Sequence, residues 1–459
     1  MKNRTINYYS TNGKSSEVTF SEALLKGLAP DGGLYLPVSF PMLNTEELSG
    51  FSGKMYHEIA SIILNKFVGN EITYKELSDL CIDAYNFDIP LEKVCDRKYI
   101  MRLDQGPTAS FKDFAARMMS RLMQYFLSIN NQNLTILTAT SGDTGSAVAS
   151  AFYGLMNINV IILFPEKEVT IMQRKQMTTL QKNINVIAVS GKFDDCQYLV
   201  KKAFRDPSLS YIPLSSANSI NIGRLLPQSV YYFYAWSRLA ARTDEKAFFS
   251  VPSGNFGNLM GGLIAARMGL PVKQFIISTN LNNEVPEYLR TGIYEPITPS
   301  MNCISSAMNV GHPSNLVRII ALYGGMMDET GRIVKEPDLK RMRKDLFGVS
   351  VSENDTRETI ADIFRKYNIV LEPHGAIAWH AIKEYSRSLG QNQSGKQLFI
   401  SLETAHPAKF PEEVRQIINI NPVLPESLTG IAEEKENYLS AGNDYARIKE
   451  LIQNICKPE

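Results

Sequence analysis

Short hydrophobic runs of strand length recur from the second quarter of the chain onward. Six of them are rich in Val, Ile, Leu or Phe: LTILTAT, NVIILFP, INVIAVSG, KAFFSVP, KQFIIST and, much later, KQLFISLE. Most are separated by intervals long enough for one or two helices. Strands that alternate with helices favour a mainly parallel sheet covered on both faces. The pattern therefore predicts an α/β protein, and such sheets bind ligands beyond the carboxyl ends of their strands.

The pattern changes along the chain in a way that predicts three parts. Residues 1–95 are expected to form helices and turns, and LAPDGGLYLP is their densest turn signal. We expect a first α/β domain over residues 96–245 and a second over residues 246–459. The second includes a turn-rich insertion at about residues 281–370, before the sheet resumes.

Composition and charge narrow the class of protein without defining a function. The chain is 44% hydrophobic and 21% charged, with a net charge of +1. A net charge so close to zero gives no strong electrostatic attraction to nucleic acid or to an acidic membrane. The start lacks the apolar core of a signal peptide, and the apolar runs are too short to cross a bilayer. The five cysteines are scattered without a CxxC pair, which favours a reduced, cytoplasmic protein.

The helix predicted in SFKDFAARMMSRLM carries a lysine on its apolar side. At about 100° per residue, Lys112 falls beside Ala116, Met119 and Met123. In one interpretation only the stem of the lysine packs, while the ammonium reaches water. In the other, desolvation lowers the lysine pKa enough for the amine to form an imine and to transfer protons.

Two glycine-bearing loops follow predicted strands. In SVPSGNFGN, Gly254 and Gly257 let the backbone approach an anion, and the N–H groups from Asn255 through Phe256 to Asn258 could hold it at a helix start. The loop lacks the lysine of a nucleotide P-loop, so it fits a small isolated phosphate better. The alternative is a tight strand–helix turn. An amine at Lys112 together with this loop would suit pyridoxal phosphate, which has an aldehyde and a phosphate.

The second loop, TATSGDTG, offers neutral donors that suit a carboxylate. The candidates are Thr140, Ser141, Gly142 and Thr144. The alternative is a helix N-cap formed by Ser141, Asp143 or Thr144.

Three further features follow other predicted elements. Ser219, Asn221 and Arg224 form a polar cluster that suits a phosphate, although a surface arginine is the alternative. Thr404 follows the last predicted strand and could hydrogen-bond a ligand ring or cap a turn. The histidine spacing suits no metal site, and we expect none.

Several of these motifs, in their order and spacing, resemble the threonine synthases. They are GPTASFKDFAARMM, TATSGDTGSAV, NSINIGRL, VPSGNFGNL and ETAHPAKF. That family belongs to the tryptophan-synthase-β-like (fold type II) pyridoxal-phosphate enzymes. YYSTNG and GLAPDGGLYLP resemble its longer form, which has an extra N-terminal domain. The resemblance spans residues 8 to 415 and implies two doubly wound, mainly parallel sheet domains plus a mostly helical N-terminal domain.

The resemblance also implies roles for matching residues. Lys112 matches the Schiff-base lysine. The cofactor phosphate would lie on Gly254, Asn255, Phe256, Gly257 and Asn258, and the ring nitrogen on Thr404. The substrate would lie on Thr140, Ser141, Gly142, Thr144, Ser219, Asn221 and Arg224. Asp143 lies beside the cofactor's phenolic oxygen, where its carboxylate needs a shared proton or a nearby cation.

The implied reaction converts O-phospho-L-homoserine and water to L-threonine and phosphate, the last step of threonine biosynthesis. One alternative is a phospho-lyase that releases 2-oxobutyrate, ammonia and phosphate from O-phosphohomoserine or phosphothreonine. A second is a non-catalytic binding protein on the same fold. We expect a small-molecule substrate, no nucleic acid and no membrane as partners, with monomer and homodimer both open.

Overall fold

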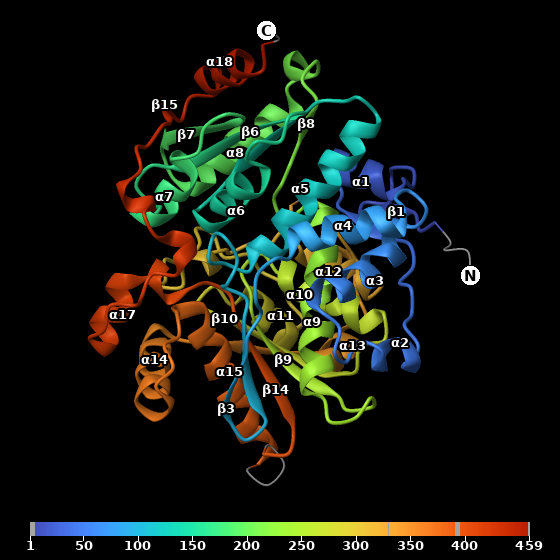
Figure 1. Cartoon of the computed structure of the whole chain (residues 1–459), viewed down its shortest axis with the longest axis vertical. Coiled ribbons are helices and arrows are strands. Elements are labelled where there is room, and N and C mark those ends of the chain that lie inside the picture. Colours follow the sequence, from blue (N-terminus) through green and yellow to red (C-terminus); the bar gives the residue numbers. More distant parts are fainter. Residues whose placement is uncertain (1–4, 329, 391–394, 458–459) are drawn as a thin grey trace.

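Two mainly parallel sheets form the centre of the protein, as the hydrophobic runs predict (Figure 1). The computed structural model describes residues 5–328, 330–390 and 395–457, so the predicted limits at residues 1 and 459 lie outside the described residues. The larger sheet has the order β13-β10-β9-β14-β4-β3, and the smaller has the order β15-β7-β6-β5-β8. All neighbouring strands in these sheets run parallel except β3 and β4.

The strands of the larger sheet are β3 (Leu91–Cys95), β4 (Lys98–Arg102), β9 (Ala247–Pro252), β10 (Val272–Thr279), β13 (Leu346–Ser350) and β14 (Leu398–Glu403). Those of the smaller sheet are β5 (Leu134–Ala139), β6 (Ile158–Pro165), β7 (Ile184–Ser190), β8 (Leu214–Ser215) and β15 (Leu439–Gly442).

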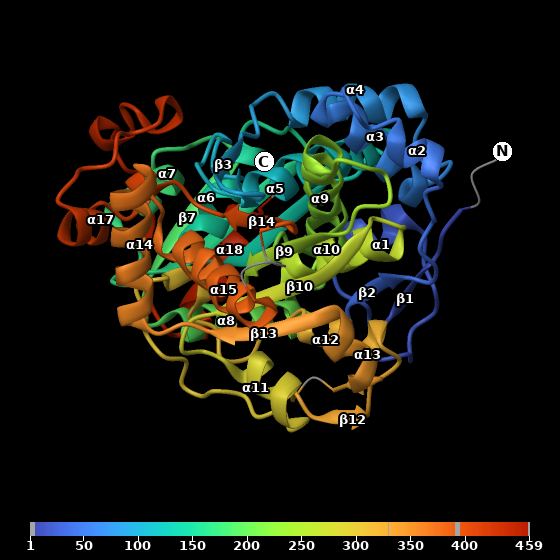
Figure 2. The ribbon, with the colours of Figure 1, turned by 90° about the horizontal axis from the view of Figure 1, so that it is seen from below.

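Helices cover both faces of the larger sheet because successive strand residues point to opposite faces. Its helices include α9 (Leu226–Leu239), α10 (Gly257–Arg267), α14 (Glu353–Tyr367) and α15 (Pro373–Leu389). Phe249 in β9 packs against Tyr232 of α9, with ring centroids 5.0 Å apart. The preceding Phe248 packs against Tyr385 of α15, with ring centroids 5.2 Å apart. Figure 2 shows α14 and α15 on one side of this sheet and α9 on the other.

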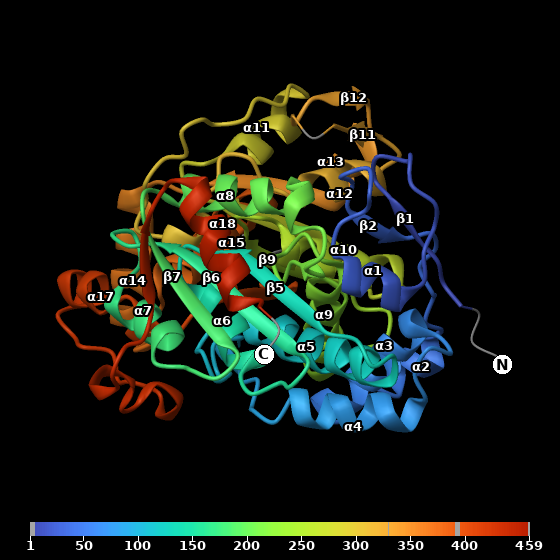
Figure 3. The same ribbon diagram turned by 90° about the horizontal axis from the view of Figure 1, so that it is seen from above.

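The smaller sheet is covered in the same way (Figure 3). Its helices are α5 (Lys112–Ile129), α6 (Asp143–Phe152), α7 (Ile171–Thr178), α8 (Phe193–Arg205) and α18 (Tyr445–Ile455). Leu137 and Ile161 lie in one hydrophobic cluster with residues of α8 and α18. Ile136 and Val160 lie in the other cluster, with residues of α5 and α6. Both sheets are therefore doubly covered, and the predicted α/β class is confirmed.

The N-terminal region is mostly helical, as the resemblance implies. It contains β1 (Tyr8–Ser10), α1 (Phe20–Lys26), β2 (Tyr35–Pro37), α2 (Thr45–Ser49), α3 (Tyr56–Val68) and α4 (Tyr74–Ala84). Thr19 and Thr73 form capping boxes that start α1 and α4. Tyr56 packs edge-on against Phe114 of α5 and Tyr234 of α9. These aromatic contacts attach the region to helices that position the site.

Each sheet contains strands from across the division predicted between residues 245 and 246: β3 and β4 in the larger sheet and β15 in the smaller one. β4 belongs to the larger sheet, and β15 pairs with β7 in the smaller one. The segment expected as an insertion contains α11 (Glu284–Thr291), α12 (Leu316–Leu322), β11 (Met326–Met327), β12 (Ile333–Lys335) and α13 (Leu339–Asp345). The sheet resumes at Leu346, well before residue 370. Sequence reasoning misses β13 because this edge strand is short and has only one buried residue, so it has no continuous apolar run.

Two short helices follow β14 in the chain. α17 (Pro411–Ile418) follows the short 3-10 helix η4 (Pro407–Lys409). Among the helices of the described residues, none is both long and apolar enough to cross a membrane.

Candidate active site

The predicted site residues lie at the carboxyl ends of parallel strands, where open α/β sheets bind ligands. Thr140 follows β5, Gly254 follows β9 closely, and Thr404 follows β14 directly. An isolated bridge between Ser110 and Ala405 brings the start of α5 beside the end of β14. At the same place, the Phe111 N–H donates to the Thr404 carbonyl, which holds Thr404 next to the residue before Lys112.

Lys112 is the first residue of α5, and its side chain is 14% exposed. The helix starts two residues later than the amphipathic pattern suggests, because the Phe111 N–H donates to the Thr404 carbonyl. Burial lowers the pKa of Lys112, and the charges of Lys409 and Arg224 lower it further, whereas Asp143 opposes them. The side chain is thus mostly desolvated, as the second interpretation of this lysine requires.

Asp143 lies between two lysines. Its Oδ2 is 3.5 Å from Lys112 Nζ, and its Oδ1 is 2.6 Å from Lys409 Nζ. Gln173 Nε2 also donates to Oδ1, at 3.0 Å. Burial raises the pKa of Asp143, but the two ammonium groups and the hydrogen bonds outweigh it and hold the pKa far below its ordinary value. Lys409 is therefore the nearby cation that a carboxylate at this position needs, and sequence reasoning did not single it out.

The glycine-bearing loop leads into α10, which starts at Gly257. Phe256 has the left-handed backbone (φ 60°) that turns the chain into the helix. A Cβ on Gly254 would lie 2.6 Å from the Ala307 carbonyl, so this position requires glycine. Among the backbone hydrogen bonds of the described residues outside regular helices and strands, none is donated by residues 254–258. Their N–H groups thus remain available to an anion at the helix start.

The side chains of the same loop fix its position. Asn258 Nδ2 donates to the Pro252 carbonyl at 2.8 Å, and Asn255 Oδ1 accepts from Ser314 Oγ at 2.9 Å. Both amides therefore hold the loop against its neighbours, and the backbone is the part that faces a ligand.

The hydroxyl of Thr140 organises the second loop. Its Oγ1 accepts from the N–H groups of Gly142 at 2.9 Å and Gly145 at 2.8 Å. The N-cap of α6 is Gly142, which has no side-chain cap. Thr140 is thus the residue whose hydroxyl accepts the N–H groups at the start of α6. None of the alternative caps, Ser141, Asp143 and Thr144, is the N-cap. Ser141 is exposed and Thr144 is half-buried, so their hydroxyls are accessible.

Arg224 is buried, which excludes its interpretation as a surface arginine. It is 4% exposed, and its Nη1 donates to the Ala217 carbonyl. Its Nε has no hydrogen-bond partner among the described residues. Burial lowers the pKa of Arg224 to about 10, while Asp113 opposes that shift. A buried guanidinium with an unused donor suits an anionic ligand.

Asn221, expected with Arg224, is committed to the loop itself. Its Nδ2 donates to the carbonyls of Leu24 at 2.8 Å and Ser216 at 3.0 Å. Its Oδ1 accepts from the Gly223 N–H at 2.9 Å. Ser219, two residues earlier, is half-buried. Asn221 therefore shapes the pocket, whereas Ser219 and Arg224 have groups left for a ligand.

Beneath Thr404 lie two buried carboxyl groups that sequence reasoning missed. Thr404 Oγ1 donates a long hydrogen bond to Glu372 Oε1, at 3.5 Å. Glu372 also contacts His374 Nδ1, and its N–H donates to Glu403 Oε1 at 3.0 Å. Burial and the charge of Glu372 raise the pKa of Glu403 well above its ordinary value. The contact of Thr404 with Glu372 lies at the upper limit of hydrogen-bond length, so the Thr404 hydroxyl can still turn to donate to a ligand.

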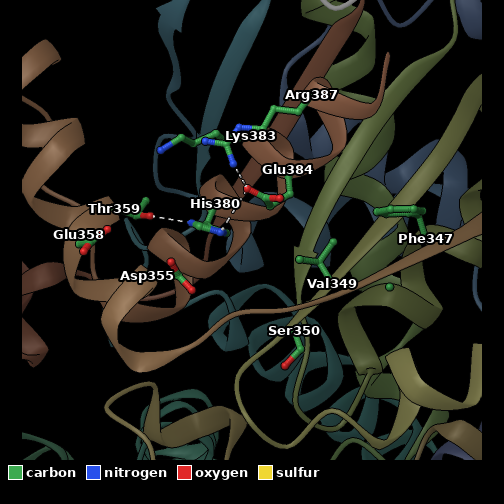
Figure 4. A pocket seen from close by; sticks show the side chains of 11 residues that line it. Phe347, Val349, Ser350, Asp355, Glu358, Thr359, His380, Lys383, Glu384 and Arg387 are labelled. Carbon is green, nitrogen blue, oxygen red and sulfur yellow. Dashed lines mark hydrogen bonds and ion pairs between the residues drawn. The ribbon is translucent and has the colours of Figure 1, made fainter. Parts of the chain in front are cut away.

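A separate pocket of about 610 Å³ lies between α14, α15 and the edge strand β13 (Figure 4). His380 faces it, with Nδ1 3.1 Å from Thr359 Oγ1. None of the residues that line it is a predicted site residue.

Among the described residues, no group of three or more His, Cys, Asp and Glu side chains could hold a metal ion.

Family models match this chain in three consecutive parts. The model described as threonine synthase N terminus matches residues 7–85, and that of pyridoxal-phosphate dependent enzymes matches residues 89–400. The model of the threonine synthase C-terminal part matches residues 375–452.

Individual proteins agree with these models. A threonine synthase of Buchnera aphidicola is 41% identical over 447 residues, which cover 97% of this chain and 99% of the relative. The crystal structure of PLP-bound threonine synthase from Brucella melitensis has a TM-score of 0.91 at 35% identity, covering 99% of this chain and 100% of that one. The Escherichia coli threonine synthase structure has a TM-score of 0.87 at 35% identity, covering 98% and 99%. This chain belongs to the threonine synthases, which are pyridoxal-phosphate-dependent enzymes.

Proposed function

We propose that this site converts O-phospho-L-homoserine and water to L-threonine and phosphate, with Lys112 as the catalytic base. The proposal rests on one mostly buried amine at Lys112 and on two candidate anion sites. One anion site is the backbone of residues 254–258, and the other contains the buried Arg224. A cofactor phosphate and a phosphorylated substrate together need two such sites.

The chemistry of the donor set fits pyridoxal phosphate. Lys112 supplies an amine for its aldehyde, and the free N–H groups of residues 254–258 suit its phosphate. The Thr404 hydroxyl can donate a hydrogen bond to its ring nitrogen, and Asp143, with Lys409 beside it, suits a place near its phenolic oxygen. When bound, the cofactor delocalises the negative charge that proton removal leaves on the substrate. The resemblance to threonine synthases supports each of these assignments.

Lys112 would carry the proton transfers. Because its pKa is lowered, a larger fraction of the amine is neutral near pH 7 and can accept a proton. We assign to its Nζ the removal of the proton from the substrate Cα. A further proton then leaves Cβ and phosphate leaves Cγ. A proton returns to Cγ, water adds its OH at Cβ, and a last proton returns to Cα to give threonine.

The remaining predicted residues would select the substrate. Ser141 and Thr144 lie at the start of α6, where their hydroxyls suit a carboxylate, and Gly142 between them gives the loop its turn. Thr140 supports these residues through the loop backbone. At the second candidate anion site, the guanidinium of Arg224 would bind the substrate phosphate.

Ser219 would assist Arg224 through its hydroxyl, and Asn221 would keep their loop in shape. Because an amino acid without a phosphate leaves the Arg224 charge unpaired in a buried site, it would bind less well. This second anion site is what sets the proposed substrate apart from ordinary amino acids.

A product assay tests the proposal. Purified protein loaded with pyridoxal phosphate is incubated with O-phospho-L-homoserine, and threonine, 2-oxobutyrate and phosphate are measured together. Threonine and phosphate in equal amounts are expected. Release of 2-oxobutyrate and ammonia without threonine would favour the phospho-lyase. Binding of the substrate without any product would favour a non-catalytic protein on the same fold.

We also propose a cytoplasmic location and three structural parts, at residues 1–95, 96–245 and 246–459. The five cysteines are all free, which suits a reducing compartment. The location is tested by cell fractionation, and the parts by limited proteolysis.

A further inference from the structure

Lys409 is an ammonium group with no exposed side-chain surface. Its Nζ lies 2.6 Å from Asp143 Oδ1 and 3.0 Å from the Thr108 carbonyl oxygen. A charge removed from water in this way is costly unless a close partner compensates it. The short contact with Asp143 provides that compensation.

Asp143 is shared unequally between its two lysines. The contact from Oδ1 to Lys409 is 2.6 Å, whereas that from Oδ2 to Lys112 is 3.5 Å. Gln173 donates to the same oxygen as Lys409, at 3.0 Å. The carboxylate is therefore held mainly on the side away from Lys112, and most of its charge is compensated there.

The backbone around Lys409 fixes it relative to Lys112. Lys409 ends the short helix η4, and the N–H of His406 before that helix donates to the Ala109 carbonyl. Thr108, which accepts from Lys409, donates from its N–H and its hydroxyl to Asp113, next to Lys112 in the chain. The two lysines are thus attached to the same loop.

We propose that Lys409 is a positioning residue that holds and neutralises Asp143, so that Lys112 can release its proton and act as the base. The inference rests on the proposed function and deepens it. Charged groups face Lys112 from three elements: Asp143 from α6, Lys409 from η4 and Arg224 from η2 (Ile222–Arg224). Asp113, on α5 itself, acts on Arg224 rather than directly on Lys112. Without Lys409, the full charge of Asp143 would fall on Lys112 and keep it an ammonium.

The proposal is tested by measuring the protonation of Lys112 itself. Full-length protein freed of its cofactor is labelled at each pH with a trace of acetic anhydride, and labelling of Lys112 is followed by peptide mass spectrometry. In Lys409→Met we expect the labelling midpoint of Lys112 to rise by about one pH unit, a tenfold change in its proton affinity. Lys409→Arg keeps the charge and should keep the midpoint. Lys246→Met, at an exposed lysine, is the matched control.

The double variant Lys409→Met/Asp143→Asn shows whether Lys409 acts through Asp143. Removing the carboxylate as well should return the midpoint to that of the wild-type protein. A midpoint that stays or falls in Lys409→Met overturns the proposal, and so does a rise that persists in the double variant. Circular dichroism checks folding, and Lys409→Gln replaces the Met variant if that one is unfolded.

A second readout uses the loaded enzyme. If Lys112 is the base, the acidic limb of the kcat profile should move to higher pH in Lys409→Met by the same amount as the labelling midpoint. The labelling result does not depend on which product forms. Failure of the proposed reaction in the product assay is therefore distinguishable from failure of this proposal.

Discussion

The Nε of Arg318 donates to the carbonyl oxygen of Tyr35 at 3.0 Å, and this contact joins the N-terminal region to the substrate loops. The same guanidinium donates to the carbonyls of Ser219 at 3.1 Å and Ile220 at 2.5 Å, and to Asn315 Oδ1 at 2.7 Å. All these acceptors are neutral, and Arg318 is fully buried. Arg318 therefore holds the segment of Ser219 against the N-terminal region.

Replacing Arg318 by Met should lower the free energy of unfolding by at least about 3 kcal/mol, because each buried acceptor left unpaired costs about 1–3 kcal/mol. The measurement is urea unfolding. Lys in its place keeps the charge but lacks the planar set of donors, so we expect a weaker loss of stability and a raised KM for the phosphorylated substrate. Arg341→Met, at an exposed arginine, is the control and should change neither quantity.

Lys112→Ala should lower kcat by at least about 100-fold, the usual contribution of a general base. The loop at residues 254–258 remains intact, so inorganic phosphate should still bind. The measurements are steady-state kinetics and phosphate titration by calorimetry. Lys246→Ala changes an exposed lysine and should leave kcat as it is. Full turnover in Lys112→Ala would contradict the role given to this amine.

Arg224→Ala should act mainly on binding of the phosphorylated substrate. A hydrogen bond to a charged group contributes about 1.5–3 kcal/mol, so KM should rise roughly 10- to 100-fold, with a smaller change in kcat. The surface variant Arg242→Ala, at an arginine 74% exposed, is the control. An unchanged KM would place the substrate phosphate elsewhere.

The sequence reveals that a charged side chain is buried only where that residue interrupts an apolar pattern. Lys112 is conspicuous because it lies among Met119 and Met123 on a helix long enough to show periodicity. Lys409 stands at the end of a three-residue helix, where no periodicity reveals burial, and its partner Asp143 is distant in sequence. Arg318 shows the same limit, since its backbone acceptors come from two segments that are distant from it in sequence.

The same reasoning explains the parts of the fold that were predicted. Central strands such as β5 and β9 are buried at every position, so their apolar runs mark them clearly. The edge strand β13 has only one buried residue and lacks such a run. Contacts between distant segments, such as Thr404 with Glu372, depend on how strands are ordered, which local patterns do not encode.

Glu284 should make stability depend on pH. This carboxyl at the start of α11 is 3% exposed, and its Oε2 has no hydrogen-bond partner among the described residues. Burial raises its pKa to about 7 from an ordinary value of 4.5. Between these values the folded protein keeps the proton that the unfolded chain releases, so stability falls as the pH rises through this window and the loss is complete above pH 7.

Glu284→Gln removes that dependence, because the amide does not ionise. Relative to the wild-type protein, the variant should gain about 3 kcal/mol in the free energy of unfolding between pH 4 and pH 8, the equivalent of the raised pKa. Urea unfolding at both pH values measures the difference. Glu295→Gln, at an exposed carboxyl, provides the control and should show no such gain. An equal effect of Glu284→Gln at both pH values would mean that Glu284 ionises at its ordinary pKa in the folded protein.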